Sequence, residues 1–120
     1  MYKISARKIQ LAQQHADIAL KRGLAVASRG KELQEYDDIK LQEYGKLIAT
    51  YGELIQQAAQ LLLLYSQLLQ EADVESRKLY ISIVEAHINA SDAHVQAVKI
   101  YQEVIRYSHT CGLHLLTNSN

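Results

Sequence analysis

Apolar and small residues recur every seven positions through the middle of the chain. With Tyr44 counted as position a of a heptad, residues 44–71 place Tyr or Ala at a, Leu at d, Ile or Leu at e, and Gly, Ala or Ser at b. Seven residues make about two turns of an α-helix, so positions that share a letter lie on one side of it. The pattern predicts one long amphipathic helix over this segment.

Three apolar positions in each heptad form a wider stripe than a two-stranded coiled coil uses, because such a coil needs only a and d. We therefore expect a bundle of at least three helices, with Leu54 and Leu61 buried between two or more neighbours. We interpret the stripe as an interaction surface. Its members are Tyr44, Leu47, Ile48, Tyr51, Leu54, Ile55, Leu61, Leu62, Tyr65, Leu68 and Leu69.

The same seven-residue phase extends upstream to about residue 9. Within it, Gly30 follows the basic Arg29, and a glycine after a basic last turn is a common helix end. This favours a break over residues 28–31 rather than one continuous helix over 3–71. Glycine weakens a helix interior, so glycines at heptad spacing indicate close contact between helices. There are four of them: Gly23, Gly30, Gly45 and Gly52.

A third helix is predicted from residue 73 to about residue 108. Asp73 can cap its first turn, and Glu75 suits the positive end of the helix dipole. Polar residues at 89–92 could cap a separate helix, but apolar residues on both sides of them keep one phase, which favours an unbroken helix. These residues are Ile81, Val84, Ile88, Val95, Val98 and Ile105.

The predicted fold class is therefore all-α. We expect an elongated antiparallel helical bundle or coiled coil of about three long helices, in a single domain over residues 1–108. The helices are placed at about 3–28, 31–71 and 73–108, followed by a flexible C-terminal tail over 109–120. Because helices of unequal length leave part of the stripe uncovered, we expect oligomerisation to complete the bundle.

Composition excludes several classes of protein. The 120 residues hold 13 basic and 13 acidic side chains, and this balance lacks the positive charge of a general nucleic-acid binder. Cys111 is the single cysteine and cannot form an internal disulfide, and no apolar run approaches the roughly 20 residues of a membrane span. We expect a cytoplasmic protein with no integral membrane segment.

The lack of Pro, Phe and Trp, with the regular heptads, is also compatible with a designed sequence.

Charge is unevenly distributed along the chain. Residues 1–30 carry six basic and one acidic side chain, a net charge of +5, whereas residues 31–72 carry three basic and seven acidic ones, a net charge of −4. Opposite charges favour these segments lying side by side. A basic, acid-poor start is also typical of a mitochondrial transit peptide. The heptad phase that continues downstream favours an ordinary helix with a basic face toward solvent.

Two histidines seven residues apart, His87 and His94, are the leading candidates for binding chemistry. A metal or haem site needs further ligands from another helix. His109, Cys111 and His114 lie in the predicted tail, which offers no rigid platform. The chain contains no glycine-rich phosphate loop, nucleophile elbow or His-Glu-x-x-His sequence. We therefore assign no catalytic residue, cofactor or metal, and expect no enzymatic activity.

The sequence favours a non-enzymatic interaction or structural module, such as an adaptor, a chaperone or an assembly subunit. Its partner would be a second copy of the chain or a helix of another protein, bound through the a/d/e stripe. The alternative is a helical bundle that binds a ligand, metal or haem through His87 and His94.

Overall fold

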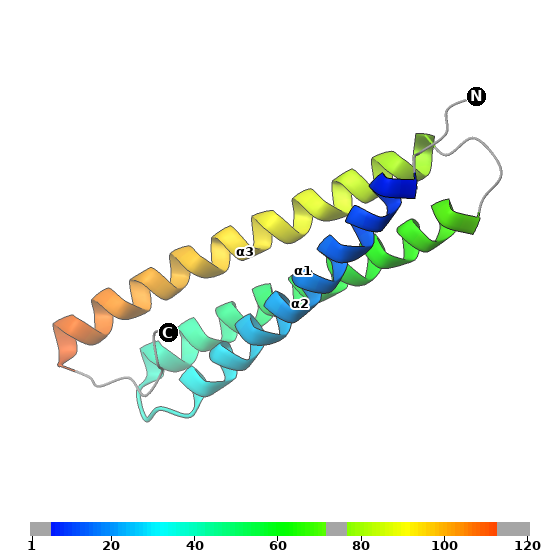
Figure 1. The fold of residues 1–120 in the computed structure, drawn as a ribbon. Helices are drawn as coiled ribbons and strands as arrows, with labels where there is room; N and C mark the ends of the chain where they lie inside the picture. Colours follow the sequence, from blue (N-terminus) through cyan, green and yellow to red (C-terminus); the bar gives the residue numbers. More distant parts are fainter. Residues whose placement is uncertain (1–5, 72–76, 113–120) are drawn as a thin grey trace.

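The computed structural model describes residues 6–71 and 77–112, and almost all of these are helical. They form α1 (Ala6–Gln34), α2 (Ile39–Glu71) and α3 (Arg77–Cys111). The helices run side by side in alternating directions (Figure 1). The part of the chain that the structure describes contains no strand, which confirms the all-α class expected from the heptads.

The bundle is longer than a compact domain of this size. α3 has 35 residues, which is about 52 Å at a rise of 1.5 Å per residue. The radius of gyration is 17.7 Å, against roughly 14 Å for a compact chain of this length. The elongated antiparallel bundle predicted from the sequence is confirmed, and its completion by further chains stays a prediction.

The turn between α1 and α2 lies at residues 35–38, so the predicted break over 28–31 is wrong. Asp38 caps α2, because its Oδ1 accepts a 3.0 Å hydrogen bond from the backbone N–H of Leu41. The hydroxyl of Tyr107 donates to the same carboxylate, at 2.9 Å from Oδ2. The bond from Leu41 is the main reason why the pKa of Asp38 lies below its usual range. Asp38 thereby joins the turn to the last part of α3.

The other boundaries follow the prediction in part. α3 continues without a break across residues 89–92, as the apolar phase predicted. It also continues through residues 109–111, so these are helical and not part of a tail. The helix starts predicted at residues 3 and 73, and the tail over 113–120, lie outside the described residues.

Glycines allow α1 and α2 to pack with their backbones in contact. A Cβ on Gly30 would collide with the backbone of Ala49 and lie 2.6 Å from the carbonyl oxygen of Gly45. A Cβ on Gly52 would collide with the backbone of Ala27. The close helix contact predicted from the glycine spacing is confirmed. It also explains why Gly30 lies inside α1 and does not end it.

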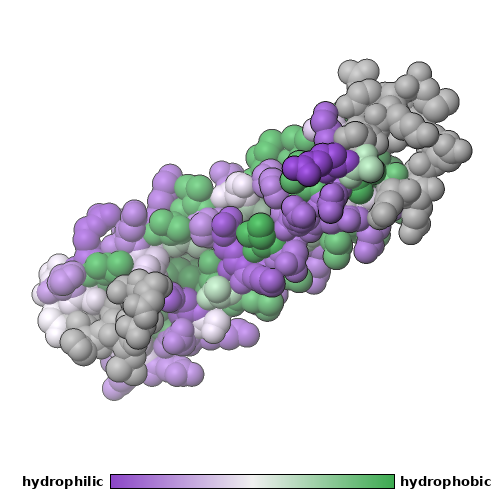
Figure 2. All heavy atoms as spheres, viewed as in Figure 1, coloured by the Kyte–Doolittle hydropathy of each residue, from purple (hydrophilic) through white to green (hydrophobic). Residues whose placement is uncertain are grey.

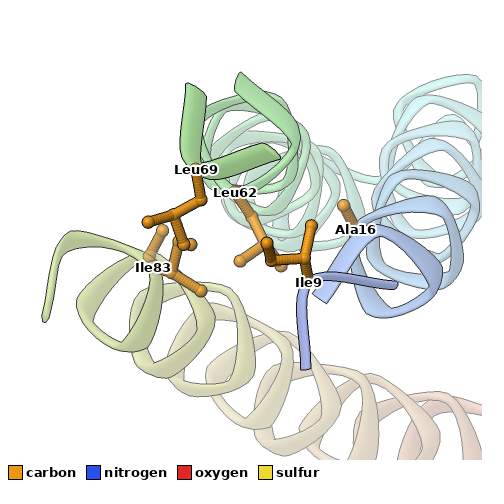
Figure 3. Packing of buried hydrophobic residues seen from close by; sticks show 6 residues of the cluster. Ile9, Ala16, Leu62, Leu69 and Ile83 are labelled. Atoms are coloured by element: carbon orange, nitrogen blue, oxygen red, sulfur yellow. The ribbon is translucent and has the colours of Figure 1, made fainter. Parts of the chain in front are cut away.

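The core contains side chains from all three helices, and the e positions of α2 lie at its centre. Ile48, Ile55, Leu62 and Leu69 are each at most 4% exposed. Figure 3 shows one end of this core, where α2 side chains meet residues of the other two helices. The labelled residues are Ile9 and Ala16 of α1, Leu62 and Leu69 of α2, and Ile83 of α3.

The leucines at the d positions of α2 lie outside this core. Leu54 and Leu61 are each 44% exposed, so their predicted burial between neighbouring helices is wrong for this chain. The physical reason is the small residues at b. α1 approaches the b side of α2 at Gly45 and Gly52, so that a, e and b point inward and d lies at the edge beside α3.

Candidate docking groove

A groove runs along the bundle between α1 and α3, and α2 forms its floor. α1 and α3 each pack mainly on α2 and make little direct contact with each other. Three hollows of about 250, 250 and 240 Å³ lie between them, lined at the bottom by Leu62, Ile55 and Ile48 of α2 respectively. The side of α2 between its two neighbours is thus left open, at the place where a four-helix bundle holds a further helix.

The two walls of the groove face each other through side chains at seven-residue spacing. Those on α1 are basic or histidine, and those on α3 are tyrosine or histidine. Because both walls share the same period, the side chains form four pairs along the groove, which we call the ladder. The pairs are Lys8 with Tyr80, His15 with His87, Arg22 with His94, and Arg29 with Tyr101.

The outer pairs of the ladder are cations lying over aromatic rings. Lys8 Nζ is 5.8 Å from the ring centre of Tyr80. The guanidinium carbon of Arg29 is 5.1 Å from the ring centre of Tyr101, and Arg29 Nη1 donates a 3.0 Å hydrogen bond to the Tyr101 hydroxyl. Cation–π contacts of this kind hold long basic side chains across the groove.

The inner pairs contain the three histidines of the groove. The rings of His15 and His87 are 5.2 Å apart between centres. Burial is the main cause that lowers the pKa of His94, and the positive charge of Arg22 lowers it further. Both causes favour the neutral form of the His94 imidazole. The inner ladder therefore disfavours additional positive charge.

Carboxylates are absent from the lining of the three hollows, all of whose lining residues are described. Asp17 of α1 is used elsewhere, in an ion pair of 3.1 Å with Lys21. Arg22 and Arg29 therefore have no carboxylate partner among residues 6–71 and 77–112. A groove with this charge attracts anionic groups and repels cationic ones.

Apolar side chains form the outer rims of the groove. On α1 the rim contains Leu11 and Ile18, which are 38% and 52% exposed. On α3, Val84, Ile88 and Val98 line the hollows. Ile81, Val95 and Ile105 lie on the same side of the helix by their heptad phase, and all six residues are between 40% and 57% exposed. The core of the bundle uses a different stripe of α3, which includes Ile83, Ala90, Ala97 and Val104. α3 is thus apolar on two faces, and one of them is uncovered.

A second apolar surface lies on the opposite side of α3, along the edge of α2. It consists of the d leucines, which are 40% to 50% exposed, and it borders a hollow of about 360 Å³ shared with polar residues of α3. Figure 2 shows how hydrophobic and hydrophilic residues alternate over one face of the bundle. The exposed d leucines are Leu47, Leu54, Leu61 and Leu68.

The predicted interaction stripe is therefore divided among three environments. Its d leucines are available to a partner, whereas its e residues are already used within the chain. Its tyrosines are half-buried along the bundle. The d leucines are Leu47, Leu54, Leu61 and Leu68, and the e residues are Ile48, Ile55, Leu62 and Leu69. The tyrosines are Tyr44, Tyr51 and Tyr65.

His87 and His94, the histidines of the alternative hypothesis, belong to two neighbouring pairs of the ladder. His87 lies against His15 of α1, while His94 lies beside Arg22. Within the described residues, no three His, Cys, Asp or Glu side chains converge on a point that could hold a metal ion. Cys111 is an exposed free thiol at the end of α3, and His114 lies outside the described residues.

Of the eight ladder residues, sequence reasoning singled out His87 and His94 only. The predicted solvent-facing position of the basic residues agrees with the exposure of Lys8 and Arg22. Their pairing across the groove was not predicted, because the partners on α3 are about seventy residues away. A signal was nevertheless present. Lys8, His15, Arg22 and Arg29 are spaced by seven residues, as are Tyr80, His87, His94 and Tyr101.

None of the helices in the described ranges has a stretch long and apolar enough to cross a membrane.

Comparison with known proteins assigns no family to this chain. We find no protein family, no characterised protein and no solved structure that matches the chain.

Proposed function

We propose that the chain is a non-enzymatic interaction module of the cytoplasm, an adaptor, chaperone or assembly subunit whose bundle is completed by a helix that it does not itself supply. One observation carries the proposal: α3 has a second apolar stripe, centred on Ile88 and Val95, that α1 and α2 leave uncovered. Large exposed apolar patches mark sites of association in proteins that otherwise fold well.

The energy available from this stripe is sufficient for association. Covering the exposed half of a Val or Ile side chain contributes about 1 kcal/mol. Six such residues on α3 therefore offer roughly 5 kcal/mol, to which Leu11 and Ile18 of α1 add, before the entropic cost of association is subtracted.

The experiment compares the molecular mass of the wild type with that of Ile88→Glu/Val95→Glu in sedimentation. Both residues are exposed, so the variant keeps its helices. We expect it to lose self-association, or to lose binding of the helical peptides described below. The control is Gln14→Glu/Ser28→Glu, which adds the same charge at exposed positions of α1 outside the groove. A wild type that stays monomeric and binds no helix would overturn the proposal.

The alternative, a bundle that binds a metal, haem or another ligand, is favoured by one contact, the pairing of His15 with His87. Two imidazoles supply half of a four-ligand site. The neighbouring cations Lys8 and Arg22 oppose a metal cation electrostatically. The groove's charge therefore supports the interaction module over a metal site.

A further inference from the structure

We propose that the groove between α1 and α3 binds an amphipathic helix that carries acidic side chains, which lies there as the fourth helix of the bundle. This inference rests on the proposed function and specifies the partner's chemistry. It combines two independent features, the shape of the groove and its charge.

The shape repeats with the period of a helix. The floor residues Leu62, Ile55 and Ile48 follow one another at intervals of seven residues, and each lines one hollow. Seven residues advance a helix by about 10.5 Å. A fourth helix with one apolar position per heptad therefore places one side chain over each hollow along its whole length.

Small residues on both walls keep the hollows open. Ala12 and Ala19 line them from α1, and Ala90 and Ala97 line them from α3. An alanine at these positions leaves room that a larger apolar side chain of a partner can fill. The rims on α1 and α3 then cover the flanks of the incoming helix, since they project beside the ladder.

The positive charge of the ladder favours a partner helix whose side chains are negatively charged. Arg22 and Arg29 have no carboxylate partner in the described chain, and the hollows are lined by no acidic residue. Carboxylates that flank the apolar positions of a partner helix reach these guanidinium groups and form charge-assisted hydrogen bonds. A lysine-bearing helix is repelled by the same groups.

A second copy of this chain fits the groove less well. Outside the groove, a second copy offers the d face of α2, which is bordered by exposed residues of both signs, Glu43, Lys46 and Glu53. A surface that carries both acidic and basic side chains is not electrostatically complementary to the basic side chains of α1 in the groove. The occupant to which we commit is therefore a helix of another protein, apolar on one side and acidic beside it.

The test uses two synthetic helices of about four heptads, one heptad for each side-chain pair of the ladder. Both carry Leu at a and d, and they differ only in Glu or Lys at e and g. Binding to the folded full-length protein is measured by fluorescence anisotropy at low and high salt. We expect the Glu peptide to bind about tenfold more tightly than the Lys peptide, with the difference reduced by salt.

Charge reversal in the groove identifies the site. Arg22→Glu/Arg29→Glu should weaken binding of the Glu peptide about tenfold and strengthen that of the Lys peptide. The matched control, Lys46→Glu/Lys99→Glu, makes the same change of net charge at exposed positions outside the hollows and should change affinity by less than about twofold. Because Arg29 also bonds Tyr101, Ser91→Glu is a second variant: it adds a carboxylate to the middle hollow without removing a contact from the ladder.

The outcomes separate this inference from the proposed function. Equal binding of the two peptides, or equal weakening by groove and control variants, overturns the acidic partner but leaves an apolar interaction module. A wild-type oligomer that dissociates in Arg22→Glu/Arg29→Glu while binding neither peptide assigns the groove to a second copy and also overturns it. Binding of neither peptide by a monomeric wild type overturns both proposals.

Discussion

At Gly30 a single methyl group decides whether α1 and α2 can pack. The position lies inside a helix, where alanine is intrinsically better than glycine by up to about 1 kcal/mol. Here the added Cβ would meet the backbone of Ala49 and the carbonyl oxygen of Gly45, which cannot move aside as a flexible side chain can. Backbone contact therefore outweighs helix propensity at this residue.

We predict that Gly30→Ala lowers the free energy of unfolding by about 2 kcal/mol, because overpacking costs more than the helix propensity returns. Urea denaturation measures this loss. Ser28→Ala, at an exposed position of the same helix, is the control and should be neutral or stabilising. A Gly30→Ala variant more stable than the wild type would contradict the close approach of the two helices.

His94 makes the stability of the fold depend on pH. Burial and Arg22 lower its pKa in the folded state, so the unfolded chain takes up a proton at a higher pH than the folded chain does. Above the pKa of histidine in the unfolded chain, near 6.5, His94 has no proton in either state and its titration does not affect stability. As the pH falls below that value, the unfolded chain is protonated first and the free energy of unfolding decreases.

We predict that the wild type loses more stability between pH 8 and pH 5 than His94→Gln does, because glutamine takes up no proton. Urea unfolding across this pH range provides the measurement. His109→Gln, which removes a histidine outside the groove, should keep the wild-type dependence. If His94→Gln had the same pH dependence as the wild type, the burial of His94 beside Arg22 would not govern it.

At the scale of a helix, α2 shows how one apolar stripe serves two purposes. Its e side chains fill the core, while its d leucines remain at the surface beside α3. The division follows from the b positions, where Gly45 and Gly52 allow α1 to approach. The heptad identifies the apolar positions of a helix, and the neighbouring helix determines which of them are buried.

We predict that alanine substitutions of two adjacent residues of α2 lower stability by different amounts. Ile55→Ala removes a side chain with no exposed surface and should cost about 3 kcal/mol, whereas the half-exposed Leu54→Ala should cost about 1 kcal/mol or less. Chemical denaturation of the two variants under conditions in which the protein is monomeric is the check. Equal losses would mean that d and e are buried alike.

For the whole molecule, the open corner of the bundle determines what can bind. α2 covers one side of α3, whose other apolar side is left exposed beside the row of cations on α1. Such a surface combines the hydrophobic driving force of a bundle core with an electrostatic preference that selects among partners.

We predict that zinc, copper and haem leave the melting temperature of the wild type unchanged. A ligand present at one hundred times its dissociation constant stabilises a protein by about 2.7 kcal/mol, a shift that calorimetry detects. The double variant His87→Gln/His94→Gln and the single variant His15→Gln serve as controls. A rise in the wild type that disappears in these variants would establish the ligand-binding alternative.

The all-α class and the presence of three long helices follow from the amino-acid pattern alone. The seven-residue recurrence of apolar residues specifies long helices, since helical periodicity is a local property of the chain. The seven-residue spacing of Gly23 with Gly30, and of Gly45 with Gly52, likewise carries the signal of close helix contact. The turn at residues 35–38 was not predicted. Its cap, Asp38, is a local signal of the same kind as Asp73, whereas the bond from Tyr107 that also holds it comes from a residue distant in sequence.

Which faces of these helices are covered depends on how the three pack together. Leu54 and Ile55 are both apolar and adjacent, and their burial differs because α1 approaches α2 from one side only. His87 lies against His15 because α1 and α3 flank the same floor, a relation that no local pattern contains. The rotation of each helix about its axis is set by the shapes that meet between helices, and so the groove and its charge emerge only when all three are packed.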